Sequence, residues 1–258
     1  MTDKLLLDEP AAGVGRLTIS NPERRGALDH ELLDALAEHA GTLDARCLVI
    51  RGSGPVFSAG YDIGNLEDGV FEEAAERLVA HPFHEAMEAL EGYPYPVVAQ
   101  VNGHAIGGGL ELALTCDIRI AARGVRMGMP PAKLGLIYSH TGLLKFLQAC
   151  GPAATAELFF VGRNVDAERA ERIGLVNDVV EPDELDDRVL ELAAEIAANA
   201  PLSLAGNKRM MRALRARTLP AELERELIQL RESCFRSEDF REGVRAFAEK
   251  RRPVWRGR

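Results

Sequence analysis

The sequence has no long apolar run and no closely spaced pair of cysteines. No stretch approaches the roughly 20 apolar residues of a membrane-spanning helix, so we expect no membrane as a partner. The first residues, Met1-Thr2-Asp3-Lys4, lack the cationic segment and long apolar stretch of a secretory signal, so we expect a cytoplasmic protein. The four cysteines are far apart in the chain, which favours reduced, packed thiols: Cys47, Cys116, Cys150 and Cys234.

Positive charge is also scarce. The 258 residues carry 31 Lys and Arg against 40 Asp and Glu, a net charge of −9. This balance disfavours nucleic acid as a general partner but allows a local basic pocket. His81 and His84 form no ligand cluster with nearby acids, so we predict no metal site.

Two glycine-rich turns stand out in what is present. One lies in Phe57–Ile63 and the other in Gly103–Glu111, where Gly107-Gly108-Gly109 precedes a stretch of good helix formers. A helix that begins at these glycines presents unpaired N–H donors, which suit an oxygen that becomes negative in a transition state. Glu111 follows in an apolar run. Either motif alone fits tight packing and a first-turn acid that faces water, but together they favour catalysis.

The rest of the chain predicts an α/β domain. Short strands are expected over 14–20, 47–50 and 96–101, with a helix capped by Asp29 and another from about Glu72 to Leu90, interrupted at Pro82. After about Asp166 the pattern is almost wholly helical. No flexible linker divides the chain, so we expect one domain over 1–258, with a core over about 1–200 and a helical C-terminal region over about 201–258.

Four segments in this order resemble the crotonase, or enoyl-CoA hydratase/isomerase, superfamily across nearly the whole chain. They are Asn21–Asp29, Phe57–Ile63, Val101–Asp117 and Phe247–Pro253. The resemblance implies a spiral of ββα repeats, with the C-terminal helices involved in forming a homotrimer or a dimer of trimers. It also implies an acyl-CoA thioester as the substrate, with CoA as part of that substrate and no tightly bound cofactor.

The resemblance further assigns roles to single residues. The N–H groups of Tyr61 and Gly108 would hold the thioester oxygen, and Glu111 matches the first of two catalytic glutamates. Residues expected along CoA are Arg24, Arg25, Ala27, Leu28, Ala59, Asp62, Ile63 and Lys250. For the basic residues the competing interpretation is an ordinary solvated charge.

The chain departs from the superfamily pattern at the second glutamate. Pro131 occupies that position and cannot transfer a proton, which puts a two-carboxylate hydration in doubt. The following segment contains Tyr138 and His140, and a tyrosine at position 138 resembles the methylmalonyl-CoA decarboxylase branch. Tyr138 is therefore a candidate catalytic residue, against the alternative that it only closes the acyl pocket.

Three functions remain open from the sequence. The first is an enzyme of enoyl-CoA hydratase/isomerase type, which stabilises a thioester enolate. The second is a decarboxylase of malonyl- or methylmalonyl-CoA type, and the third is a non-catalytic CoA-thioester-binding subunit. A dinucleotide-binding enzyme is disfavoured because Gly107-Gly108-Gly109 lacks the GxGxxG spacing.

Overall fold

The computed structural model describes residues 2–61, 82–134, 138–215, 220–223, 225–226, 238–239, 242, 246, 249 and 251–258. The strands are β1 (Leu5–Ala11), β2 (Val14–Ile19), β3 (Cys47–Gly52), β4 (Val56–Ser58), β5 (Val97–Val101), β6 (His104–Ile106), β7 (Ile118–Ala122), β8 (Arg126–Gly128), β9 (Val165–Asp166) and β10 (Asp178–Val180). The helices are η1 (Pro22–Arg24), α1 (His30–Thr42), α3 (His84–Gly92), α4 (Gly108–Thr115), η3 (Pro131–Leu134), α5 (His140–Ala156), η4 (Glu157–Val161), α6 (Ala167–Arg172), α7 (Leu185–Ala197) and α8 (Pro201–Arg215).

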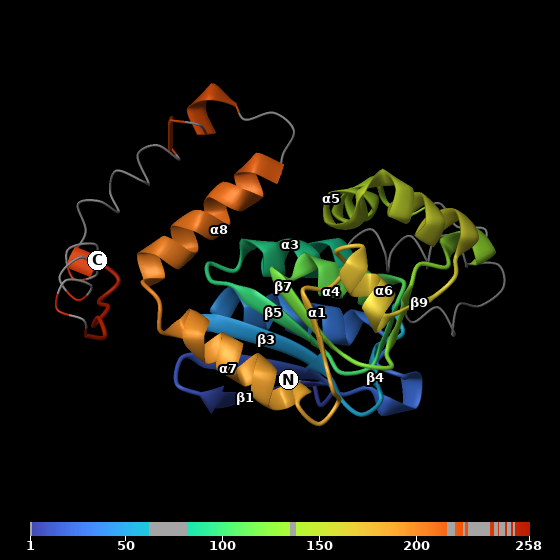
Figure 1. Ribbon diagram of the computed structural model, residues 1–258, viewed down its shortest axis with the longest axis horizontal. Coiled ribbons are helices and arrows are strands. Elements are labelled where there is room, and N and C mark those ends of the chain that lie inside the picture. The colour runs from blue at the N-terminus through green and yellow to red at the C-terminus, as the bar shows by residue number, and fades with distance from the viewer. Residues whose placement is uncertain are drawn as a thin grey trace.

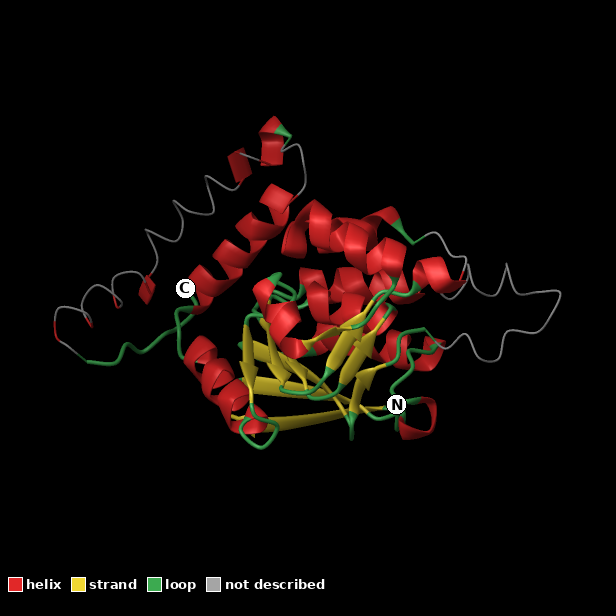
Figure 2. Cartoon of the chain, turned by 45° about the vertical axis from the view of Figure 1, so that its right-hand side comes forward, coloured by secondary structure: helices red, strands yellow, loops and turns green. Residues whose placement is uncertain are grey.

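From β3 to β8, successive strands alternate between two sheets, which confirms the predicted ββα spiral. The larger sheet has the order β1-β2-β3-β5-β7-β10 and the smaller one β4-β6-β8-β9. Thus β3, β5 and β7 each turn a corner into the strand that follows, and equivalent strands of successive turns pair in parallel. Most of the helices lie on one side of these strands (Figure 2). In this arrangement the connection between β6 and α4 packs against the preceding repeat of the spiral.

Local signals explain several element boundaries. The Asp29 side chain accepts a hydrogen bond from the Leu32 N–H at 3.0 Å and caps α1, as predicted. Strands β2, β3 and β5 lie where the apolar runs predicted them. Of the helix expected from about Glu72 to Leu90, the part after Pro82 is seen as α3, which begins at His84, while residues 62–81 lie outside the described part.

The expectation of an almost wholly helical chain after Asp166 was too simple. Strand β10 pairs with β7 and forms the edge of the larger sheet. Its three residues are all half-buried, so no alternation marks them in the sequence.

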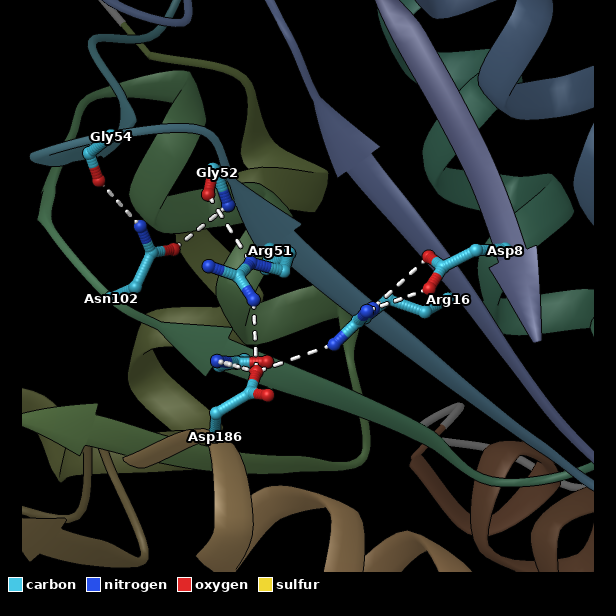
Figure 3. A network of polar contacts seen from close by, with 8 residues as sticks. Asp8, Arg16, Arg51, Gly52, Gly54, Asn102 and Asp186 are labelled. Carbon is cyan, nitrogen blue, oxygen red and sulfur yellow. Dashed lines mark hydrogen bonds and ion pairs between the residues drawn. The ribbon is translucent and has the colours of Figure 1, made fainter. Parts of the chain in front are cut away.

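Helix α7 covers the larger sheet on the face opposite to the other helices (Figure 1). Its first turn is fastened by Asp186, whose Oδ1 accepts hydrogen bonds from Arg51 at 2.9 Å, Gln100 at 3.0 Å and Arg16 at 3.3 Å (Figure 3). Arg16 also pairs with Asp8 of β1. One carboxylate therefore ties α7 to three neighbouring strands.

No helix in the described part of the chain is both long and apolar enough to span a membrane. The three cysteines that this part contains, Cys47, Cys116 and Cys150, are free thiols, as predicted. Burial raises the pKa of the Cys47 and Cys116 thiols to about 12, so both stay protonated and unreactive at neutral pH.

Candidate active site

The first glycine turn leaves β4 and packs directly on the second. Gly60 has φ of +92°, and a Cβ there would lie 2.7 Å from the Ile106 carbonyl oxygen and 3.0 Å from the Gly108 nitrogen. Only a residue without Cβ fits such a conformation and such a close approach. The backbone of Tyr61, the next residue, is thereby held beside the start of α4.

The second turn forms the start of α4, as predicted. Gly107 is the N-cap with φ of +56°, and Gly108 is the first helical residue. The N–H of Gly108 has no partner four residues earlier in the helix, so it points outward from the helix start. A Cβ on Gly108 would lie 3.1 Å from Cε1 of the Tyr61 ring. The two residues predicted to supply N–H donors are thus in contact, and their role as an oxyanion hole stays a prediction.

Glu111 lies in the first turn of α4, and only 2% of its surface is exposed. The Tyr138 hydroxyl donates to Glu111 Oε2 at 2.5 Å, and the Tyr61 hydroxyl lies 3.3 Å from that of Tyr138. Tyr138 has a single proton and gives it to the carboxylate, so Tyr61 must be the donor to Tyr138. A chain of two hydroxyls therefore ends on the carboxylate beside the glycine turns.

The surroundings of this chain set its protonation. Burial raises the pKa of Glu111 above its ordinary value, while the positive charge of Lys145 and the hydrogen bond from Tyr138 act against this rise. Burial and the nearby Glu111 charge also raise the pKa of Tyr138 and of Tyr61. Both tyrosines therefore stay neutral and can donate hydrogen bonds at every pH near neutrality.

Aromatic packing fixes the two tyrosines. Phe83 meets the Tyr61 ring edge-on with 4.7 Å between centroids, and Phe159 meets the Tyr138 ring at 5.6 Å. Gly142 of α5 completes the enclosure, because a Cβ there would lie 2.6 Å from Glu111 Oε2 and 2.6 Å from Tyr138 Cε1. Helix α5 can approach the carboxylate this closely only with glycine at that position.

The predicted CoA residues in the N-terminal segment lie beside the first glycine turn. Ala59 N–H donates to the Arg25 carbonyl at 3.1 Å, and Leu28 N–H donates to the Gly60 carbonyl at 2.8 Å. Arg24, Arg25 and Ala59 are exposed, whereas Ala27 and Leu28 are buried.

The structure therefore brings the backbone of Arg25 against Ala59, and that of Leu28 against Gly60 and Tyr61. The side chains of Ala27 and Leu28 belong to the core, so a ligand would meet their backbone. Asp62, Ile63 and Lys250, also predicted along CoA, lie outside the described residues.

Two charged residues of this site were not identified from the sequence. Lys145 of α5 lies 3.6 Å from Glu111 Oε1 and 3.0 Å from Oε1 of Glu91 on α3. A lysine inside the apolar run Leu143-Leu144-Lys145-Phe146-Leu147 was the available signal, because lysine is rarely buried without a partner. Glu91 gave none, since it lies among ordinary helix-surface residues.

The remaining candidates are exposed, have a structural role or cannot transfer a proton. His140, the first residue of α5, is exposed. His104 has a structural role, because its Nδ1 accepts a hydrogen bond from the Arg126 N–H at 3.0 Å. Pro131 is buried in η3. Among the described residues, no group of three or more His, Cys, Asp and Glu could hold a metal ion.

The sequence matches the family model for enoyl-CoA hydratase/isomerase over residues 9–258. A protein of Bacillus subtilis (strain 168) named "Probable enoyl-CoA hydratase" is 33% identical over 256 residues, which cover 95% of each chain. The carnitinyl-CoA dehydratase of Salmonella paratyphi A is 37% identical over 221 residues, 83% of each chain. A solved structure of the enoyl-CoA hydratase from Bacillus anthracis superimposes with a TM-score of 0.91 at 28% identity, covering 99% of this chain and 100% of the other.

Proposed function

The chain belongs to the enoyl-CoA hydratase/isomerase family of enzymes, within the crotonase superfamily, and we propose that it adds water to an enoyl-CoA thioester, or removes it in the reverse direction. The observation that carries this proposal is the buried Glu111 carboxylate, which lies one helical turn after Gly108 and beside the Tyr61 turn. The names of the relatives, a hydratase and a dehydratase, support a reaction in which water is gained or lost.

The proposed reaction uses the two glycine turns first. The thioester oxygen accepts hydrogen bonds from the N–H groups of Tyr61 and Gly108, which stabilise the negative charge of the enolate. Removing one such donor typically costs ~10²–10³ in rate, so these bonds carry a large part of the catalysis. Neither donor needs a side chain, and the glycines allow the substrate to approach the backbone closely.

Glu111 then transfers the protons. Its carboxylate takes one proton from water as the water oxygen bonds to the β-carbon, and the electron pair of the double bond moves to the thioester as an enolate. The same group then returns that proton to the α-carbon, so one water is consumed and Glu111 is restored. Because Pro131 replaces the second glutamate, this single carboxylate serves both steps, and Tyr138 supports it through the 2.5 Å hydrogen bond.

Decarboxylation of a malonyl- or methylmalonyl-CoA-type substrate is the second candidate. The specific observation in its favour is the Tyr138 hydroxyl, which lies in the site where the second carboxylate is missing. That reaction needs the same enolate and a proton for the α-carbon. The Glu111 carboxylate counts against it, because a second negative charge beside it would be repelled.

Mass spectrometry of products separates the candidates. The wild-type protein is incubated with an enoyl-CoA and, separately, with methylmalonyl-CoA. We expect the enoyl-CoA to gain one water, and Glu111→Gln to lower the rate by about 10²–10⁴-fold. Glu88→Gln, on the exposed side of α3, is the matched control and should leave the rate unchanged.

Loss of carbon dioxide from methylmalonyl-CoA, with no hydration, would instead establish the second candidate. Binding of CoA thioesters with no turnover of either substrate would contradict both and favour a non-catalytic binding subunit.

We also propose that the chain forms a homotrimer or a dimer of trimers in the cytoplasm, through the helical region over about 201–258. Large apolar side chains that are exposed in the single chain support association: Phe160 is 81%, Leu214 65% and Met211 55% exposed. CoA belongs to the substrate, and we propose no tightly bound cofactor. Light scattering after size-exclusion chromatography measures the mass, and a monomer at micromolar concentration would contradict the assembly.

A further inference from the structure

Lys145 is the point where charged groups from three helices meet. Its ammonium lies 3.0 Å from Glu91 Oε1 on α3 and 3.6 Å from Glu111 Oε1 on α4, and its side chain is only 16% exposed. Lys145 and Glu91 also line a cavity of about 260 Å³ among α3, α5 and α8, which Lys208 and Arg212 of α8 line as well. The ammonium therefore lies between the buried carboxylate and this cavity.

The polar and charged groups that act on the Glu111 carboxylate come from α3, from α5 and from the residues just before α5. Tyr138, before α5, holds Oε2, while Lys145 faces Oε1. Tyr61 follows as the next hydroxyl, and Glu91 raises the pKa of Glu111 through its like charge. Lysine is thus the one cation among the groups that act on this carboxylate within the described residues.

The other charged groups around the cavity are mostly paired among themselves. Lys208 lies 2.8 Å from Asp117, and His84 lies 3.3 Å from Glu88. Arg212 and Arg215 line the cavity from α8. Lys145 is the residue whose ammonium contacts both a cavity-lining carboxylate and the catalytic one.

A buried carboxylate without a counter-charge takes up a proton at neutral pH, because desolvation disfavours its ionised form. A protonated Glu111 cannot accept a proton from water. The Tyr138 hydrogen bond stabilises the carboxylate but supplies no charge. An ammonium next to Oε1 supplies it, and Glu91 holds that ammonium in place from the other side.

We propose that Lys145 is a positioning residue for the reaction, whose ammonium, anchored by Glu91, holds the Glu111 carboxylate in its ionised form against the two glycine turns. This rests on the proposed role of Glu111 as the proton-transfer group. Lys145 itself exchanges no proton with the substrate. It acts through Glu111, and its contact with Glu91 joins α3 to α5 beside that carboxylate.

The test is a ¹³C NMR titration of protein labelled at the glutamate side-chain carboxyls. The Glu111 resonance is assigned by its absence in Glu111→Gln, and its midpoint is measured in three variants. Lys145→Met keeps the apolar stem and should raise the midpoint by about one pH unit or more, because an opposite charge is lost. Lys145→Arg keeps the charge and should stay near the wild-type midpoint.

Glu91→Gln gives a prediction of opposite sign. It removes a like charge, while the amide oxygen of glutamine can still accept a hydrogen bond from the Lys145 ammonium and hold it in place, so the midpoint should fall below that of the wild type. The acid limb of kcat/KM should move with the midpoint in each variant. If Lys145 acted on packing alone, Lys145→Met would not raise the Glu111 midpoint while Lys145→Arg kept it near the wild-type value.

An unchanged midpoint in folded Lys145→Met, or shifts of the same sign in Lys145→Met and Glu91→Gln, would overturn the proposal. If Lys145→Met fails to fold, Lys145→Gln, which also removes the charge, takes its place and should raise the midpoint in the same direction. The titration uses the protein without substrate, so it is independent of turnover. Full activity of Glu111→Gln would instead refute the proposed role of Glu111 while leaving the measured charge coupling intact.

Discussion

Replacing Tyr138 with phenylalanine removes one hydroxyl and keeps the ring that packs against Phe159. The Glu111 carboxylate then loses its 2.5 Å hydrogen bond, and the Tyr61 hydroxyl loses its acceptor. Since that bond lowers the pKa of Glu111 and burial raises it, its removal leaves the carboxylate more basic. The pH below which Glu111 is protonated and inactive as a base therefore moves upward.

The size of this shift follows from the hydrogen bond. A bond to a charged group is worth about 1.5–3 kcal/mol, and one pH unit corresponds to about 1.4 kcal/mol. We expect the acid limb of kcat/KM to move up by about 1–2 pH units. Above the new limb Glu111 is ionised again, so the plateau should fall less than about tenfold if Tyr138 only supports the carboxylate.

The assay is the pH dependence of kcat/KM for hydration of an enoyl-CoA, which reports the ionisation of the free enzyme. Tyr95→Phe, a tyrosine away from the carboxylate, is the matched control and should reproduce the wild-type profile. An unshifted acid limb in Tyr138→Phe would refute the reasoning. A plateau lower by about 10²–10⁴-fold would mean that Tyr138 itself transfers a proton.

Three further substitutions test the packing behind the site and the fold. Gly142→Ala should remove most of the activity, because its Cβ would lie 2.6 Å from the Glu111 carboxylate. Gly41→Ala, where a Cβ would have no atom within 4 Å, should keep the wild-type kcat and KM in a steady-state assay. Gly60→Ala should lower kcat by more than about tenfold, because φ of +92° and a 2.7 Å contact force both glycine turns apart; unaltered turnover would show that the turns tolerate displacement. Asp186→Ala should lower the free energy of unfolding by about 1–2 kcal/mol, because three donors lose their acceptor at a partly exposed site. Asp187→Ala, in the same helical turn, should change it by less than about 0.5 kcal/mol. Equal losses for the two variants in urea denaturation would contradict this role of Asp186.

Local sequence signals were sufficient for much of the fold. The structure contains the Asp29 helix cap, the apolar strands over 47–50 and 96–101, and the helix that begins within Gly107-Gly108-Gly109. These features are predictable because capping, burial and backbone freedom act within a few residues. Strand β10 was missed because three half-buried residues give no period.

The charges around Glu111 required the folded chain. The contact between Tyr138 and Glu111 depends on how closely α5 approaches α4 at Gly142, a distance that no sequence spacing specifies. The Lys145–Glu91 pair likewise joins two helices 54 positions apart, and only tertiary packing brings them to 3.0 Å. Polar residues within apolar runs indicated the candidates in the sequence, but their contact partners became known only from the folded structure.

Exchange of the α-proton tests the central claim most directly, because hydration and decarboxylation share the thioester enolate. A saturated acyl-CoA is incubated with the enzyme in D₂O, and deuterium at the α-carbon is measured by mass spectrometry. The account predicts exchange with the wild-type protein and a loss of about 10²–10⁴-fold in Glu111→Gln, with unchanged exchange in Glu88→Gln. Equal exchange in the wild type and Glu111→Gln, or none in a wild-type protein that binds the thioester, would contradict it.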